Sequence, residues 1–413
     1  MKTEPAIRPS EALKHVRYEI RGRLARRALE LERQGYEIIS LNIGNPRAFG
    51  FRTPETMRLA MIENLGQAEG YCHQKGIFPA REAVVMQQQE RGVEGVTAEE
   101  VFIGNGVSEL IDLTLRALLS DGDEVLVPSP DYPLWTAAVT LNRGRAVHYP
   151  CRPEQGFVPD PAEIGRLITP RTRALVVINP NNPTGAVYPR AVLEALARLA
   201  ERHGLVVFSD EIYDQMTYEG AEFVPMATLV HDTLCATLSG LSKVYRACGY
   251  RAGWAVFSGR VHAAADYLNA LELLASLRLC SNVMAQWAVQ YLLEHPENAH
   301  DGEPVQHKIA CPFIPRSSHS WPEASTFRIS STHSGSPAAA RHWRHWGPQS
   351  KPLRWVSMFA AMLSSRSRIG DVALTSRAAT EMIPLRYINF RMPLTVSSRD
   401  GSALPQTEAS RAI

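Results

Sequence analysis

The chain has 413 residues, of which 45% are hydrophobic and 21% charged, and its formal net charge is +2. This composition predicts a globular protein with a large core, in two domains, and excludes a disordered or fibrous chain. A charge so close to zero gives no overall field that would draw the chain to nucleic acid or to an anionic membrane.

Cysteine usage and the start of the chain bear on its compartment. The cysteines include no CxxC pair and no closely spaced framework, which argues against a zinc site or a disulfide scaffold and favours a reducing cytosol; they are Cys72, Cys151, Cys235, Cys248, Cys280 and Cys311. The start of the chain lacks an apolar secretion signal, and no run of about 18 apolar residues occurs. We therefore expect a cytoplasmic protein with no metal site, no membrane span and no nucleic-acid partner.

Residues 11–34 carry apolar side chains at helical spacing among many charges, which predicts an exposed amphipathic helix. The stretch "IISLNIGNP" (38–46) then predicts a short strand that ends at Pro46. Both elements lie before the regular part of the chain.

From about residue 100 to residue 260, short apolar runs alternate with helical patterns such as 109–119 and 190–204. The runs are 101–104, 124–128, 145–150, 174–179, 205–210, 235–240 and 254–259. Continuous apolar runs between helices are typical of a mostly parallel sheet that is covered on both faces. The sequence therefore predicts an α/β fold with a mostly parallel seven-stranded sheet sandwiched by helices.

The last part of the chain has a different composition. Beyond about residue 296 both periodicities are lost, and from residue 301 basic residues outnumber acidic ones about two to one. One interpretation is a basic, largely disordered extension. The other, which we favour, is that the reading frame is lost near residue 295, because out-of-frame translation of GC-rich DNA gives this Arg, Ser, Pro and Ala bias. Only residues 354–363 could form a short helix there.

Polar clusters follow several of the apolar runs. In an open parallel sheet, the carboxyl ends of the strands and the loops that leave them build the site. The stretch "GNGVSEL" (104–110) follows the first run and opens a helix. The backbone amides near Gly106, Val107 and Ser108 are therefore candidates for anion binding at the positive end of the helix dipole, and a simple glycine turn is the alternative.

Two further clusters follow the fourth and fifth runs. The stretch "NPNNPTG" (179–185) presents Asn182, for which an ordinary Asn/Pro turn is the alternative. In "SDEIYDQM" (209–216), Asp210 stands at the end of a strand and Tyr213 follows three residues later. The alternative for Asp210 is a helix cap.

Lys243 comes just after the sixth run, and Arg251 follows eight residues later. Together, the clusters place a phosphate-binding helix start, an amide, a carboxylate, a tyrosine and a lysine at one edge of the sheet. A phosphate, a phenolic oxygen, a ring nitrogen and an aldehyde would engage all of them. Pyridoxal 5'-phosphate carries these four groups.

Seven motifs occur in the order of a known family, so residues 10–295 resemble the fold-type I, class I pyridoxal-phosphate aminotransferases, and most of all the bacterial alanine aminotransferases. The motifs are "LNIGNPRAFGF", "YCHQKGIFPAREAV", "GNGVSELIDL", "PSPDYPLW", "VINPNNPTG", "SDEIYD" and "LSGLSKVYRACGYRAGW". The resemblance implies a homodimer that transfers an amino group between an amino acid, alanine or glutamate, and a 2-oxo acid, pyruvate or 2-oxoglutarate.

The resemblance also implies roles for single residues. Lys243 would form the Schiff base with the cofactor and then shuttle a proton. Asp210 would pair with the ring nitrogen, whereas Tyr213 and Asn182 would donate to the phenolic oxygen. Tyr132 would stack on the ring, with an exposed loop tyrosine as the alternative.

Further residues would hold the phosphate and the substrate. The phosphate ligands implied by the resemblance are Gly106, Val107, Ser108, Ser242 and Arg251, with Arg251 as a bidentate partner. Tyr71 would reach the phosphate of the neighbouring subunit. Gly44 would lie beside the substrate carboxylate, or else serve as a simple turn glycine.

One family feature has only a weak counterpart. Members carry an arginine in a short "FR" strand of a smaller second domain, which binds the substrate carboxylate. Here only "YINFRMPL" (387–394) offers such a residue, Arg391. We expect an N-terminal arm at 1–45, a cofactor-binding domain at 46–296 and an atypical basic region at 297–413. The alternative function is a product of a frameshifted gene that binds the cofactor but is catalytically impaired.

Overall fold

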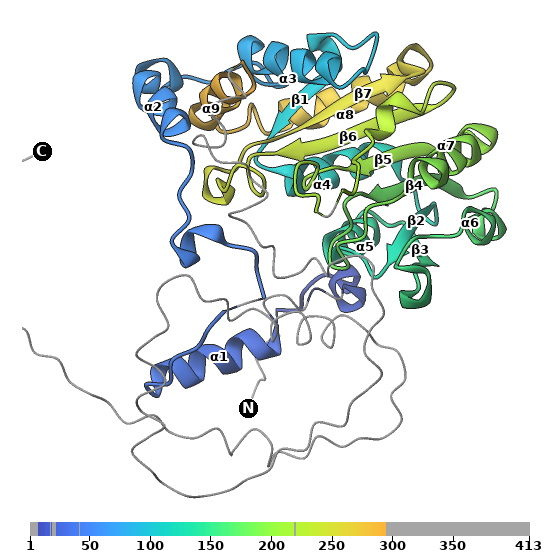
Figure 1. Cartoon of the computed structure of the whole chain (residues 1–413), viewed down its shortest axis with the longest axis horizontal. Helices are drawn as coiled ribbons and strands as arrows, with labels where there is room; N and C mark the ends of the chain where they lie inside the picture. Colours follow the sequence, from blue (N-terminus) through green and yellow to red (C-terminus); the bar gives the residue numbers. More distant parts are fainter. Residues whose placement is uncertain (1–6, 17, 19–21, 41, 219, 295–413) are drawn as a thin grey trace, which may run out of the picture. The chain divides into compact units, whose positions relative to one another are not determined.

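The computed structural model describes residues 7–16, 18, 22–40, 42–218 and 220–294 (Figure 1). In these ranges the α-helices are α1 (Arg23–Arg33), α2 (Glu55–Glu63), α3 (Phe78–Glu90), α4 (Val107–Leu118), α5 (Pro133–Leu141), α6 (Pro161–Leu167), α7 (Arg190–His203), α8 (Ala265–Leu277) and α9 (Val283–Glu294). The strands are β1 (Val101–Gly104), β2 (Glu124–Ser129), β3 (Arg145–Pro150), β4 (Thr172–Ile178), β5 (Val206–Asp210), β6 (Leu234–Gly240) and β7 (Gly253–Gly259). Short 3-10 turns include η1 (Glu11–His15), η3 (Pro46–Phe49) and η4 (Leu65–Ala68).

The strands form one seven-stranded sheet in the order β1-β7-β6-β5-β4-β2-β3. Strands β2 to β6 pair in parallel, and β7 pairs antiparallel to both β6 and β1. Strand β1 therefore runs in the same direction as β2 to β6. The predicted mostly parallel seven-stranded sheet is confirmed, and each predicted run lies on one of these strands.

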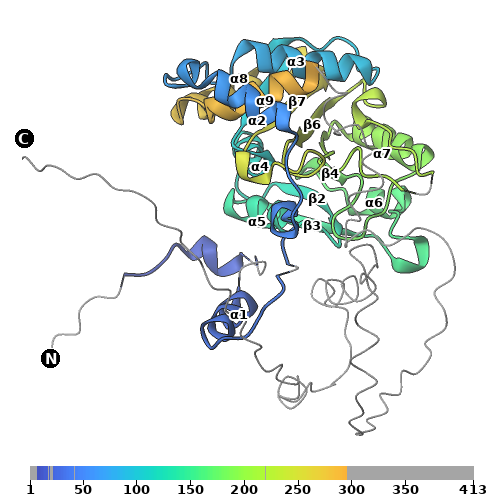
Figure 2. The ribbon, with the colours of Figure 1, turned by 60° about the vertical axis from the view of Figure 1, so that its left-hand side comes forward.

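Helices cover both faces of the sheet, as the fully apolar central strands require. Helices α4, α5 and α8 pack on one face, over a core that includes Phe102, Trp135, Phe208 and Phe257. Helices α3, α6, α7 and α9 pack on the other face, over a core that includes Tyr149, Tyr188 and Trp254. Helix α9, from a distant part of the chain, lies beside both α2 and α3 (Figures 1 and 2).

Two predictions before residue 50 are wrong. Residues 11–34 do not form one helix, because η1 ends at His15 and α1 begins at Arg23, after Gly22. No residue of α1 is buried, so the prediction of an exposed helix holds for this shorter element. The strand predicted at 38–46 does not form: Ile39 is 71% exposed and no described strand pairs with this segment, while Pro46 begins η3. An apolar run needs a pairing partner to become a strand.

The division into 1–45, 46–296 and 297–413 stays a prediction, since the third region lies outside the described residues. The short helix considered at 354–363 lies outside them as well.

Candidate functional site

Most of the residues predicted from the sequence lie at one edge of the sheet, where β1, β2, β4, β5 and β6 end. Because β7 runs in the opposite direction, its first residue lies at this same edge. The pairs Gly104 with Gly253 and Gly240 with Gly253 align the ends of β1 and β6 with the start of β7. Strand order thus brings Arg251, which precedes β7, to the loops that follow the parallel strands.

The start of α4 forms an anion-binding geometry. Gly106 is the N-cap of α4 with φ 82° and ψ 164°, a backbone conformation that only glycine adopts readily. A Cβ atom at this position would collide with Nη2 of Arg251. The guanidinium of Arg251 lies against this turn and donates to the carbonyl oxygens of Asn105 (3.1 Å) and Cys248 (2.9 Å). A cation and the free amides of a helix start therefore stand together, as a phosphate site requires.

Glycine at the start of β7 lets the helix come this close. A Cβ atom at Gly253 would lie 2.8 Å from the backbone nitrogen of Val107, and one at Gly240 would lie 2.8 Å from the Cα atom of Gly253. Any side chain there would push α4 away from the sheet. Ser108, in the first turn of α4, is half-buried beside this contact.

Asp210, the last residue of β5, is 3% exposed. Its Oδ2 accepts a hydrogen bond of 3.0 Å from Nε1 of Trp135, and its Oδ1 accepts a long one of 3.5 Å from the backbone N–H of Ile212. Burial raises the pKa of Asp210 to about 6, against the opposing effects of Trp135 and of the Lys243 charge. Residues 211–216, which directly follow Asp210, form a turn and not a helix, so the helix-cap alternative is wrong.

Lys243 follows β6 and lies close enough to Asp210 for their charges to interact. Its Nζ donates to the carbonyl oxygen of Gly44 at 3.3 Å, and a Cβ atom at Gly44 would lie 3.3 Å from that same Nζ. Gly44 is therefore a neighbour of the lysine, in keeping with the prediction that it borders the substrate. Ser242, the preceding residue, is half-buried.

Tyr132 is the N-cap of α5 and is hydrogen-bonded to Ser108 and to Tyr18. Burial raises its pKa, and the nearby Asp210 charge acts in the same direction. The alternative of an exposed loop tyrosine is wrong. These contacts join the ends of three elements: the start of α5, the start of α4 and the segment before α1.

The turn that carries Tyr213 is anchored on both sides by buried carboxylates. Glu211 accepts from Ser209 Oγ (2.8 Å) and from the backbone N–H of Met226 (3.0 Å), and burial raises its pKa to about 7. Asp214 pairs with Arg91 at 2.5 Å, and burial raises the pKa of Asp214 although the Arg91 charge opposes this. Tyr213 itself is half-buried against the core.

The loop 179–185 is a turn built by Asn181 rather than by Asn182. The Oδ1 of Asn181 accepts from the hydroxyl of Thr184 at 2.9 Å, and its Nδ2 donates to Tyr188 at 3.3 Å. Asn182 is half-buried on this loop. The turn alternative and the site prediction are thus compatible, since Asn181 makes the turn and leaves Asn182 beside it.

Two predicted residues are not among those at this edge. Tyr71 is 81% exposed, as a residue that reaches into another subunit would be. Arg391 lies outside the described residues.

Sequence reasoning missed Tyr18 and Trp135. Trp135 has a signal that could have found it, since it lies three residues after Tyr132, on the same helix start. Tyr18 sits among charged residues before α1, and no pattern there distinguishes it.

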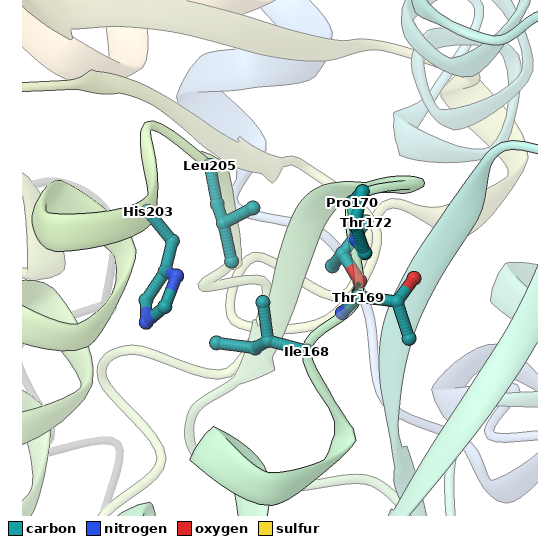
Figure 3. A pocket seen from close by; sticks show the side chains of 6 residues that line it. All are labelled: Ile168, Thr169, Pro170, Thr172, His203 and Leu205. Carbon is teal, nitrogen blue, oxygen red and sulfur yellow. Dashed lines mark hydrogen bonds between the residues drawn. The ribbon is translucent and has the colours of Figure 1, made fainter.

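A hollow of about 350 Å³ lies at the opposite edge of the sheet, where β4 and β5 begin (Figure 3). It is lined by Ile168, Thr169, Pro170, Thr172, His203 and Leu205. Leu205 comes just before β5, whereas Asp210 is the last residue of that strand. None of the predicted site residues lines this hollow.

The described part of the chain also bears on disulfides, metal sites and membrane spans. Its five cysteines are free thiols, namely Cys72, Cys151, Cys235, Cys248 and Cys280. Within the described ranges, no cluster of three His, Cys, Asp or Glu side chains could hold a metal ion. Among the helices of those ranges, none has the length and apolar character to cross a membrane.

A mostly parallel sheet with a lysine, a buried carboxylate and a helix start at one edge suits the binding of a phosphorylated, aldehyde-bearing cofactor. The family model "Aminotransferase class I and II" matches residues 36–307, so the chain belongs to the class I and II aminotransferases. These enzymes depend on pyridoxal 5'-phosphate.

Individual relatives support the same family. The glutamate-pyruvate aminotransferase AlaA of Escherichia coli is 50% identical over 287 residues, which cover 70% of this chain and 71% of the relative. The alanine aminotransferase of Mycobacterium tuberculosis is 47% identical over 297 residues, covering 72% and 69%.

Solved structures agree with these relatives. An aminotransferase from Escherichia coli matches with a TM-score of 0.69 at 49% identity, covering 70% of this chain and 72% of that one. The alanine aminotransferase of Pyrococcus furiosus matches with a TM-score of 0.68 at 38% identity, covering 71% and 74%.

The residues at this edge fit pyridoxal 5'-phosphate. Arg251 and the amides at the start of α4 suit a phosphate dianion. Asp210 is a buried carboxylate that a protonated ring nitrogen would neutralise. The Lys243 amine lies within electrostatic reach of that carboxylate, as an aldehyde-binding lysine should.

Proposed function

We propose that the chain transfers an amino group between L-alanine or L-glutamate and pyruvate or 2-oxoglutarate, in two half-reactions that use the same site. The observation that carries the proposal is the meeting of Lys243, Asp210 and the start of α4, with Arg251 against it, at one sheet edge. The names of the relatives, glutamate-pyruvate aminotransferase and alanine aminotransferase, support this choice of substrates.

Each residue has a task that follows from its surroundings. When bound, the cofactor supplies an aldehyde that takes up the amino group and a protonated ring that accepts electrons. Arg251 and the amides of Val107 and Ser108 would hold the phosphate and so fix the cofactor in place. Asp210 would keep the ring nitrogen protonated, because a buried carboxylate favours a neighbouring cation.

Lys243 would move the proton. Its Nζ must be neutral to accept a proton from the substrate Cα, and a nearby cationic cofactor favours the neutral amine. Gly44 lies against this Nζ and leaves room for a small substrate there. Tyr213 and Asn182 would donate to the phenolic oxygen from the turns that carry them.

The test is an amino-transfer assay on the cofactor-loaded chain. L-alanine and 2-oxoglutarate should give pyruvate and glutamate, and borohydride treatment should attach the cofactor to the peptide that contains Lys243. Labelling at another lysine, or none, would refute the assigned site. Labelling at Lys243 without pyruvate would refute the proposed substrates or the activity.

A second candidate function rests on the extent of the family match. The match ends at residue 307, and the relatives above align over about 70% of their own length. The frameshift hypothesis accounts for this: the cofactor half of the site, from Gly44 to Arg251, precedes residue 296, whereas the substrate half would follow it. Such a product would bind pyridoxal 5'-phosphate without transferring amino groups. Sequencing the gene around codon 296 for a single-base insertion or deletion tests this candidate.

The proposal includes a cytoplasmic homodimer with shared sites. The exposure of Tyr71 supports it, as do exposed apolar side chains on and after α8, namely Leu273, Leu277 and Leu279. One chain has a mass of 45.8 kDa, and light scattering of the purified protein should give twice that mass. In a dimer, Tyr71→Phe should weaken cofactor binding, because the phosphate of the neighbouring subunit would lose a hydrogen bond. A monomer with full cofactor affinity would contradict this part of the proposal.

A further inference from the structure

Trp135 lies in the first turn of α5, three residues after Tyr132, and its side chain is fully buried. Its ring packs against Phe208 of β5, with ring centroids 5.6 Å apart. The indole Nε1–H donates a 3.0 Å hydrogen bond to Oδ2 of Asp210. A residue from the helical layer therefore reaches the carboxylate at the end of β5.

The direction of this hydrogen bond decides which form of Asp210 it favours. An indole N–H can only donate, so it stabilises a carboxylate oxygen and offers nothing to a carboxyl proton. The other described hydrogen bond to this carboxylate, from the N–H of Ile212, is long at 3.5 Å. Trp135 is thus the better placed of these two donors, at a carboxylate that water reaches poorly.

We propose that Trp135 is a positioning residue for amino transfer: its indole N–H fixes the orientation of the Asp210 carboxylate and favours the ionised carboxylate over the neutral acid. The proposal rests on the proposed function, in which Asp210 meets the ring nitrogen of the cofactor. The same helix start carries Tyr132, whose hydroxyl is bonded to Ser108. The first turn of α5 therefore supports both the carboxylate and the phosphate-binding end of α4.

A matched pair of variants separates this role from packing. Trp135→Phe keeps an aromatic ring against Phe208 and removes the N–H. Trp254→Phe is the control: Trp254 is equally buried, and its Nε1 has no hydrogen-bond partner among the described residues. Both variants lose the same atoms, but only the first loses a donor to Asp210.

The measurement is a ¹³C-carboxyl NMR titration of the cofactor-free full chain labelled at aspartate, with Asp210→Asn identifying the resonance. The Asp210 midpoint should rise by about one to two pH units in W135F, which is the effect of losing one hydrogen bond to a charged group. In W254F it should stay at the wild-type value. An unchanged midpoint in W135F would overturn the proposal.

A second measurement needs no substitution at Trp135. In the wild-type chain, the indole ¹⁵N–H resonance of Trp135 should shift with pH at the same midpoint as the Asp210 carboxyl, and this shift should vanish in D210N. If the chemical shift of the Trp135 indole did not change with pH at the Asp210 midpoint, the proposal would be overturned, even if W135F did not fold.

Cofactor affinity then distinguishes this proposal from the proposed function. At pH 7.5, W135F should bind pyridoxal 5'-phosphate about tenfold more weakly than W254F and wild type, the effect of roughly one charged hydrogen bond. If wild type and W254F bind the cofactor and W135F binds equally well, the role of Trp135 is refuted and the function stands. If none of the three binds it, the proposed function fails, and so does the part of the proposal that concerns the cofactor.

Discussion

Replacing Gly106 with alanine should damage cofactor binding much more than it damages the fold. The residue has φ 82° and ψ 164°, a region in which a non-glycine residue costs about 1–3 kcal/mol. The added Cβ atom would also collide with Nη2 of Arg251. The guanidinium must then move, or the turn must open, and either change disturbs the cation and the amides that would hold the phosphate.

The control is Gly204→Ala. Gly204 ends α7 with φ 63° and ψ 32°, and nothing lies within 4 Å of a Cβ atom there. An alanine in this left-handed conformation costs about 1–2 kcal/mol of strain, but its Cβ atom clashes with nothing. Thermal unfolding should therefore show a modest loss for G204A and a larger one for G106A. Spectroscopic titration with pyridoxal 5'-phosphate should show at least tenfold weaker binding for G106A alone, on the estimate that one charged hydrogen bond is lost. Equal affinities in the two variants would refute the assignment of this turn.

Three further predictions concern charged groups. Because burial raises the folded-state pKa of Asp210 from 3.8 to about 6, the contribution of Asp210 to the stability of the cofactor-free chain should fall by up to about 3 kcal/mol as the pH rises from about 4 to 6 and stay level above that. Glu211, whose pKa burial raises to about 7, adds a fall of its own. The measurement is therefore the difference in unfolding free energy between wild type and D210N at each pH, and a difference that does not change with pH would refute the prediction. Lys243→Ala should lower amino transfer at least about a hundredfold in the pyruvate assay and abolish borohydride labelling, so measurable turnover near the wild-type rate would contradict the role of the lysine. Arg91→Ala should lower the free energy of unfolding by about 3–5 kcal/mol in denaturant unfolding, because it leaves the buried carboxylate of Asp214 without its partner. Arg27→Ala breaks an exposed ion pair and should lower that free energy by at most about 1 kcal/mol. A similar loss in both variants would refute the reasoning.

The sheet could be predicted because each of its strands carries its own signal. The runs at 174–179 and 235–240 are apolar on both faces, and the structure buries all of β6 and nearly all of β4. Polar residues at the ends of such strands must lie at one edge, so the grouping of Asp210 with Lys243 followed from topology alone. The reversed direction of β7 was not anticipated, yet it is what places Arg251 at that edge.

Contacts between separate elements could not be predicted in this way. The hydrogen bond from Trp135 to Asp210 depends on how α5 rests on β5, which no local pattern encodes. The contact of Tyr18 with Tyr132 joins residues that are more than a hundred positions apart. The strand predicted at 38–46 does not form for the same reason: a local apolar pattern does not show whether a second strand is near enough to hydrogen-bond with it.

The pairing of β1 has a consequence for how the chain folds during synthesis. The first strand to leave the ribosome has β7, the last, as its one described partner in the sheet. Its backbone groups must therefore wait until residue 256 has been made, and the turn after Gly104, which we propose binds phosphate, cannot settle on Gly253 before that residue exists. A nascent chain would hold an unpaired strand while the residues between β1 and β7 are made, the period in which long-range pairing leaves a protein most open to aggregation or to chaperone capture.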